Sequence, residues 1–178
     1  MRRKDKQIRD EEALDRMLSD AAVCRLAMAA VGTAAAADPA APERGPADGR
    51  AGGERDSFAE YPYVIPLHFA HEGGRIYIHS ARTGRKIRML ARDPRVCLEI
   101  DEYLGLVPSE KACKYSSRFR SLVIFGTAAL VSGTAEKRRA LQLLMRKYAG
   151  QPFEFTEEEV ERVAIIEVTI EAISGKRA

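Results

Sequence analysis

Apolar residues recur at every second position in several stretches of the chain, which is the spacing of a half-buried strand. The clearest case is 95–100, where Val96, Leu98 and Ile100 fall on one face. Runs of this kind, rich in β-branched and aromatic residues, predict six strands at 23–31, 63–69, 75–80, 95–100, 119–131 and 163–173. Gly126 interrupts the fifth strand and predicts a bulge or a close backbone approach. The mixed segment 101–117 is expected to be a loop.

Other segments show the 3.6-residue spacing of amphipathic helices. The expected helices cover 11–21, 84–93, 134–150 and 156–160. Asp10 and Thr134 stand where the side chain of an N-cap would accept a backbone hydrogen bond. Six strands with a few peripheral helices predict a small, mainly antiparallel barrel.

Two of the expected strands lead into a group of cations. The run 63–69, a turn at 71–74 and the run 75–80 predict a β-hairpin that leads into the helix starting near Gly84. Arg82, Arg85 and Lys86 crowd the start of that helix, although a helix start carries partial positive charge and favours acids. A bound phosphate would resolve the conflict, because backbone N–H groups and side-chain cations would then face it together. The alternative is a solvated basic surface.

Composition limits the possible classes of protein. The 178 residues predict one domain, 1–178, and 46% hydrophobic with 31% charged residues is typical of a globular protein. The net charge is only +3 and the cations are scattered, which disfavours a nucleic-acid partner. Residues 32–60 are mostly Ala, Gly and Pro and are expected to be a flexible insertion within the domain, because they offer little apolar surface to bury.

The cysteines and the apolar runs indicate in which cellular compartment the protein is found. Cys24, Cys97 and Cys113 are odd in number, form no C-x-x-C pair and are expected to be reduced thiols buried in or beside strands. The basic N-terminus leads into an acidic amphipathic segment, so no signal peptide is expected. No uncharged apolar run approaches the length of a membrane span. The prediction is a cytoplasmic protein with no membrane partner.

The three histidines differ in their surroundings. His71 lies in the expected turn and is interpreted as solvated, and His68 faces away from Leu67 and Phe69 as an exposed or hydrogen-bonded polar residue. His79 ends the strand that leads to the cations, where it could donate a proton or position a ligand. Packing against a cofactor is an equal alternative. Neither a Ser-His-Asp order nor paired carboxylates indicate a hydrolase, and no metal site is expected.

Five segments together resemble a known family. They are VCRLAM (23–28), PYVIPLHF (62–69), IYIHSARTGRK (76–86), DPRVC (93–97) and FRSLVIFG (119–126). Their order is similar to that of the flavin-binding split barrels of the pyridoxamine 5′-phosphate oxidase superfamily, and most similar to the nitroimidazole-resistance (Nim-type) branch. The resemblance covers nearly the whole chain apart from 32–60.

The resemblance implies a six-stranded antiparallel split β-barrel of the FMN-binding type, forming a homodimer with FMN at the interface. It assigns Ile65, Pro66 and Leu67 to the edge of the isoalloxazine ring. His79 and Ser80 would lie beside the flavin. The resemblance also implies that Arg85 and Lys86 hold the phosphate and that Ser121 reaches it from the partner or from its own subunit. His79 is also the candidate catalytic residue.

The expected reaction follows from the family and from one departure. The chain has no Trp and ends soon after Ile173, whereas pyridoxamine phosphate oxidases carry a C-terminal tail with Trp and Arg for their substrate. Oxidation of pyridoxamine phosphate is therefore not expected. The leading hypothesis is an FMN-dependent oxidoreductase that takes hydride from NAD(P)H and reduces a small acceptor such as a nitroaromatic or a quinone. The alternatives are a haem-binding or haem-degrading protein that uses His79 or His68, and a flavin-binding module without turnover.

Overall fold

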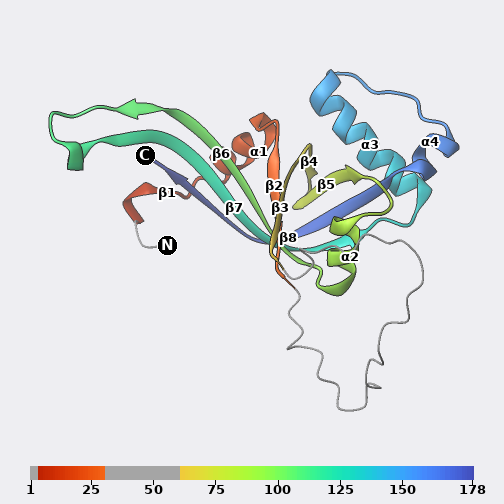
Figure 1. The fold of residues 1–178 in the computed structure, drawn as a ribbon. Helices are drawn as coiled ribbons and strands as arrows, with labels where there is room; N and C mark the ends of the chain where they lie inside the picture. The colour runs from red at the N-terminus through yellow and green to blue at the C-terminus, as the bar shows by residue number, and fades with distance from the viewer. Residues whose placement is uncertain (1–3, 31–60) are drawn as a thin grey trace, which may run out of the picture.

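The chain folds around one curved antiparallel sheet (Figure 1). The computed structural model describes residues 4–30 and 61–178, and the insertion expected at 32–60 lies outside them. The strands are β1 (Gln7–Ile8), β2 (Cys24–Met28), β3 (Tyr63–Leu67), β4 (Ala70–Glu72), β5 (Arg75–Ser80), β6 (Arg95–Val107), β7 (Ser116–Leu130) and β8 (Ala164–Arg177). The helices are α1 (Glu11–Asp20), α2 (Arg85–Arg92), α3 (Thr134–Ala149) and α4 (Glu157–Arg162).

The strand order explains why the barrel is split. It runs β3-β2-β6-β7-β8-β5-β4, with β1 pairing to β8. The two edge strands, β3 and β4, are separated in the chain only by His68 and Phe69. The sheet therefore curls until its edge strands, β3 and β4, lie close together. No hydrogen-bonded ladder joins these two strands, so the barrel stays open between them. The predicted mainly β, antiparallel split barrel is confirmed, although the sheet has eight strands instead of six. The additional strands, β1 and β4, are too short to show a period in the sequence.

The inside of the barrel is filled by one face of the sheet. Leu26, Leu98 and Ile124 lie opposite one another on β2, β6 and β7, and none of them is exposed to solvent. Helix α3 packs against β4, β5 and β8. Figure 1 shows β6 and β7 continuing together beyond the barrel as a long curved ribbon. No helix in the described part of the chain is long and apolar enough to cross a membrane.

The predicted hairpin between 63–69 and 75–80 is wrong in its pairing. Strand β3 pairs with β2, and the short β4 forms the hairpin with β5. Gly73 and Gly74 make its turn at φ values of 59° and 75°, which only glycine adopts readily. Pro66 accounts for the position of β3, because a proline without an N–H group is tolerated on an edge strand.

The loop predicted at 101–117 is also wrong over most of its length. Strand β6 continues to Val107 and pairs there with Ser116 at the start of β7. Leu104, Leu106 and Val107 remain exposed on this ribbon, so the segment lacks the inside-outside alternation by which strands are recognised. A register shift beside Gly105, at φ 121°, bends the ribbon.

The helices lie where the sequence predicts them, and one of the two expected N-caps is found. The Asp10 carboxylate accepts a hydrogen bond from the Glu12 N–H, and Thr156 forms a capping box at the start of α4. Thr134 does not cap α3. Gly133 occupies that position, and the Thr134 hydroxyl donates to the Glu161 carboxylate at 3.0 Å.

The cysteines follow their prediction in part. All three are free thiols. Cys24 is buried and Cys97 is half-buried, as expected for residues on strands, but Cys113 is exposed. The reason is that Cys113 lies in the 3₁₀ turn Ala112–Lys114 at the tip of the β6–β7 ribbon, which projects away from the core.

The close approach expected at Gly126 is confirmed and generates a stability prediction. A Cβ atom there would lie 2.2 Å from the Thr169 carbonyl oxygen on β8, where the β7–β8 register shifts. Gly126→Ala should lower the free energy of unfolding by about 1–3 kcal/mol, because the two backbones must separate. Urea denaturation measures the change. Ala129→Ser, an exposed site on the same strand, should stay within about 0.5 kcal/mol of the parent protein. Equal free energies of unfolding for Gly126→Ala and the parent protein would contradict the prediction, because β7 and β8 would then separate without loss of stability.

Candidate functional site

Two cavities meet at His68 and His79. The first, about 260 Å³, is lined by these histidines together with Val23, Pro66 and Leu67. The second, about 230 Å³, lies between the same two histidines and the apolar side of α3. The residues of the expected flavin site on β3 and β5 therefore do come together, although these strands lie far apart in the order of the sheet.

Strand β5 fixes the position of His79. This residue pairs with Ile165 of β8, and its side chain points away from the direction of its buried neighbours Ile78 and Ser80. Burial lowers the pKa of His79, and the nearby charges of His68 and Lys86 lower it further. Near neutral pH its imidazole is therefore uncharged, with one N–H donor and one nitrogen acceptor. His79 can hydrogen-bond a ligand in either sense.

The three expected cations have different surroundings. Arg82 donates to the Glu161 carbonyl oxygen at 3.1 Å, and Arg85 donates to the Tyr61 carbonyl oxygen at 3.0 Å. The Arg85 guanidinium also lies 4.7 Å from the centre of the Tyr63 ring. Arg82 thus links the segment before α2 to α4, and Arg85 links α2 to the start of β3.

Lys86 is the expected cation whose charge acts on His79. It is half-buried, and within residues 4–30 and 61–178 it forms no ion pair with a carboxylate. Burial lowers the pKa of its ammonium group, since the charged form loses hydration without gaining a counter-charge. An anion at this position would restore the balance.

The β3 residues contribute to the cavity and to the core, and Leu67 contributes to both. Pro66 and Leu67 line the 260 Å³ cavity. Ile65 is half-buried, lies opposite Leu26 and packs against the main core. Its side chain therefore faces the inside of the barrel, and the cavity wall consists of the other two residues.

The two expected serines lie far apart. Ser80 is buried next to His79, and its hydroxyl donates to the Ala81 carbonyl oxygen at 3.0 Å. Ser121 pairs with Lys176 of β8, eleven residues beyond Ile165, which pairs with His79. At about 3.3 Å per residue, this corresponds to roughly 36 Å of strand. Ser121 does not join the site of its own chain.

The structure adds Tyr148 to the site, together with His68, which the sequence indicated only as a haem ligand. His68 lines both cavities, and its ring centre lies 4.6 Å from that of Tyr148. The Tyr148 hydroxyl accepts from the Phe69 N–H at 2.9 Å and lies 2.8 Å from the Ala22 carbonyl oxygen. Helix α3 thereby fixes the short connection between β3 and β4. The signal in the sequence was the amphipathic spacing of 134–150, which predicted a helix without indicating what its apolar side would cover.

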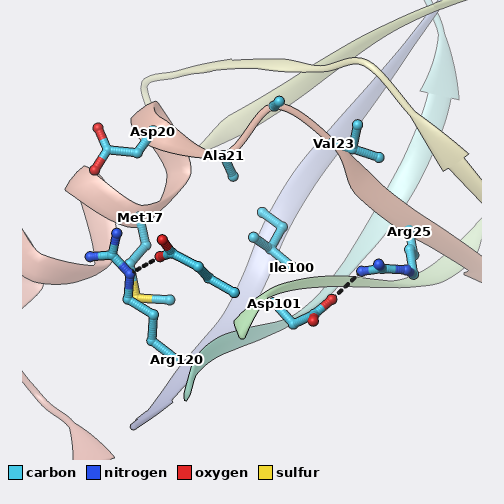
Figure 2. Close-up of a pocket in the computed structure, with 10 residues that line it drawn as sticks. Met17, Asp20, Ala21, Val23, Arg25, Ile100, Asp101 and Arg120 are labelled. Atoms are coloured by element: carbon cyan, nitrogen blue, oxygen red, sulfur yellow. Dashed lines mark hydrogen bonds and ion pairs between the residues drawn. The ribbon is translucent and has the colours of Figure 1, made fainter. Parts of the chain in front are cut away.

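A larger cavity of about 350 Å³ lies elsewhere, between the end of α1 and the β6–β7 ribbon (Figure 2). Four of its charged groups pair with one another, because Arg25 pairs with Asp101 and Arg120 pairs with Glu102. Val23 lines this cavity as well as the one beside His79. Ser121, which follows Arg120, lies near this larger cavity. The described residues contain no group of His, Cys, Asp and Glu side chains that could hold a metal ion.

Comparisons with known proteins agree with this geometry. The sequence profile of the family described as Pyridoxamine 5′-phosphate oxidase matches residues 56–177. A proposed 5-nitroimidazole antibiotic resistance protein from Bacteroides thetaiotaomicron is 25% identical, with a TM-score of 0.72 over 96% of this chain and 86% of that one. It supports the resemblance to the Nim-type branch. An uncharacterized protein of Rhizobium meliloti (strain 1021) is 39% identical over 44 residues, which are 25% of this chain and 28% of that protein.

More distant structures share the fold. The flavocytochrome Anf3 from Azotobacter vinelandii has a TM-score of 0.74 at 21% identity, over 100% of this chain and 72% of that one. The FAD and heme binding protein from Mycobacterium smegmatis has a TM-score of 0.73 at 20% identity, over 97% of this chain and 73% of that one. With the profile match covering most of the sequence, the chain belongs to the pyridoxamine 5′-phosphate oxidase family of split-barrel proteins, and its likeness is to the nitroimidazole-resistance branch.

Proposed function

We propose that this protein is a cytoplasmic, homodimeric flavoprotein that binds FMN and uses NAD(P)H to reduce a small acceptor. The observation that carries the proposal is the half-buried ammonium group of Lys86, which has no carboxylate partner in the described chain and lies beside His79. Three free thiols are in keeping with a reducing compartment.

The start of α2 suits the phosphate of the cofactor. The first turn of this helix contains no acidic residue, and Gly84 precedes it with φ 120° and without a side-chain cap. Backbone N–H groups at a helix start are therefore left for a ligand, and Lys86 adds a full positive charge. A phosphate bound here would favour the charged lysine that burial disfavours. Arg85 supports this proposed role by anchoring the start of β3, at Tyr61 and Tyr63, to α2.

The 260 Å³ cavity suits one edge of the flavin ring. Pro66 and Leu67 supply an apolar wall, and the neutral imidazole of His79 supplies hydrogen bonding at the other side. Bound FMN would supply reversible two-electron chemistry that none of the side chains can provide. His79 is the proposed catalytic residue and would donate a hydrogen bond to the acceptor, because it lines both cavities and its neutral ring carries one N–H group.

The proposed reaction balances with one nicotinamide for each two-electron step. For a nitroaromatic acceptor, NAD(P)H, one proton and R–NO₂ give NAD(P)⁺, R–NO and water. The hydride supplies both electrons, and the nitro group loses one oxygen as water. The nitroaromatic class is taken from the 5-nitroimidazole resistance protein that this chain resembles.

A second copy of the chain is needed to complete the site. An apolar row crosses the outer face of the sheet through residues that pair from strand to strand, namely Val64, Ala27, Cys97, Phe125 and Ala172. Val64 and Phe125 are 57% and 54% exposed, as expected for a surface that a partner covers.

Pro66, which lines the cavity, and Ser121, the expected phosphate contact, lie on the same face of the sheet as this row. Pro66 lies two residues from Val64, and Ser121 lies four residues from Phe125. A two-fold dimer built on this face would carry Ser121 of the partner subunit toward the cavity beside Pro66.

Haem is the second candidate ligand. His68 and His79 line the same two cavities, and two histidines facing one space can hold an iron. Two proteins of the same fold are described as a flavocytochrome and as an FAD and heme binding protein. A Soret band in the purified protein that is lost in His79→Ala or His68→Ala would favour haem over flavin.

The phosphate site is tested by charge reversal. Lys86→Glu should reduce retained flavin at least tenfold, because a carboxylate would face the phosphate. The flavin released by denaturation is measured by absorbance and identified as FMN or FAD by mass spectrometry. Arg92→Glu makes the same change at the far end of α2 and should keep the parent stoichiometry. Unchanged flavin content in Lys86→Glu would remove Lys86 from the proposed site.

Turnover is tested by following the flavin absorbance near 450 nm without oxygen. Addition of NADH or NADPH should bleach the band, and a nitroaromatic should then restore it with the stoichiometry given above. A band that persists with both nicotinamides would favour the flavin-binding module without turnover.

The dimer is tested at the centre of the apolar row. Phe125→Glu should give a folded monomer with little retained flavin, because a buried carboxylate would be left without a partner across the interface. Light scattering gives the mass, and circular dichroism reports the fold. Leu130→Glu, at an exposed apolar residue near the end of the same strand, should remain dimeric. A dimeric Phe125→Glu protein would place the interface elsewhere.

A further inference from the structure

The second cavity at the histidines is the most apolar space beside the proposed flavin site. Leu141, Leu144 and Met145 of α3 form one wall, and Phe155 from the connection to α4 closes it. Among residues 4–30 and 61–178, no Lys, Arg, Asp or Glu lines it. Its volume of about 230 Å³ lies below the roughly 300–1,000 Å³ of sites for drug-sized ligands. A ligand held here must be small and is offered no counter-charge.

Few polar atoms in this cavity are available to a ligand. The Tyr148 hydroxyl is occupied by the backbone of Phe69 and Ala22, at 2.9 and 2.8 Å. The imidazole nitrogens of His68 and His79 remain. Because the lowered pKa of His79 keeps its ring neutral near pH 7, that ring can donate one hydrogen bond without attracting an anion.

The two cavities are arranged as neighbouring compartments. His68 and His79 line both of them, while Pro66 and Leu67 belong only to the first and α3 only to the second. A ligand against α3 would therefore lie beside the proposed flavin ring, with His79 in reach of both. Reduction requires such proximity of donor and acceptor.

We propose that the cavity against α3 is the acceptor site and that it selects small, uncharged, single-ring compounds whose nitro or quinone oxygen faces His79. This inference rests on the proposed reductase function. Met145 and Phe155 determine the specificity, because they set the depth and the apolar character of the wall. An acceptor that carries a carboxylate is disfavoured, since its charge would be buried without a cation.

The test uses two ligands that differ by one charge. Nitrobenzene and 4-nitrobenzoate are titrated by calorimetry into the purified protein with the cofactor that it retains. Nitrobenzene should bind at least tenfold more tightly. Met145→Trp should weaken nitrobenzene binding at least tenfold by filling the cavity, without changing flavin stoichiometry. Arg146→Trp, an exposed neighbour on the same helix, should bind as the parent does. Phe155→Trp provides a second way to fill the cavity if Met145→Trp is unstable.

Two results would overturn the inference. One is equal affinity for both ligands, and the other is unchanged nitrobenzene affinity in the folded, cavity-filled variants. Failure of the reductase proposal is recognised separately, from flavin content and from bleaching by NAD(P)H. Selective, cavity-dependent binding of nitrobenzene to a protein that retains no flavin would identify a site for small aromatic ligands and overturn its role as an acceptor site.

Discussion

The structure depends on the pairing of β8 with strands on both of its sides. It pairs with β7 from Ile166 to Arg177 and with β5 from Ala164 to Thr169, so one continuous strand joins the two halves of the sheet. Ile166 and Val168 are fully buried within it. Gly126 permits β7 to come close to β8 where the register shifts. The same pairing places His79 opposite Ile165, so the geometry of the site follows directly from the ladder that closes the fold.

Two half-buried lysines differ in the groups that surround their charge. Lys147 donates to the Leu18 carbonyl oxygen at 2.9 Å and lies 3.6 Å from the centre of the Phe69 ring. Burial lowers its pKa to about 8, but its ammonium group has partners, and it holds α3 against α1 and the β3–β4 connection. Lys86 has no comparable hydrogen bond or ion pair among the described residues. For this reason the proposed phosphate is placed at Lys86 and not at Lys147.

The sequence predicted local structure well where a segment has one buried face. The helix after Gly84, the Asp10 cap and the close approach at Gly126 were all found where expected. Prediction failed where both faces of a strand are exposed, as in the ribbon around Leu106, because no alternation remains to be recognised. It failed again for the pairing of β3, since period and composition identify a strand without identifying its neighbour.

The sequence by itself determined the fold class, the order of the motifs and the basic start of α2, because these follow from hydrophobic spacing, turn residues and charge along one segment. Only the tertiary structure decided which of those residues share a space. It brought Pro66, Leu67 and Lys86 to His79, turned Ile65 into the core and placed Ser121 far away on β7. It also added α3 as the wall of a second cavity. The physical reason is that the closure of a sheet and the packing of a helix are long-range events, which the alternation of side chains along one strand does not encode.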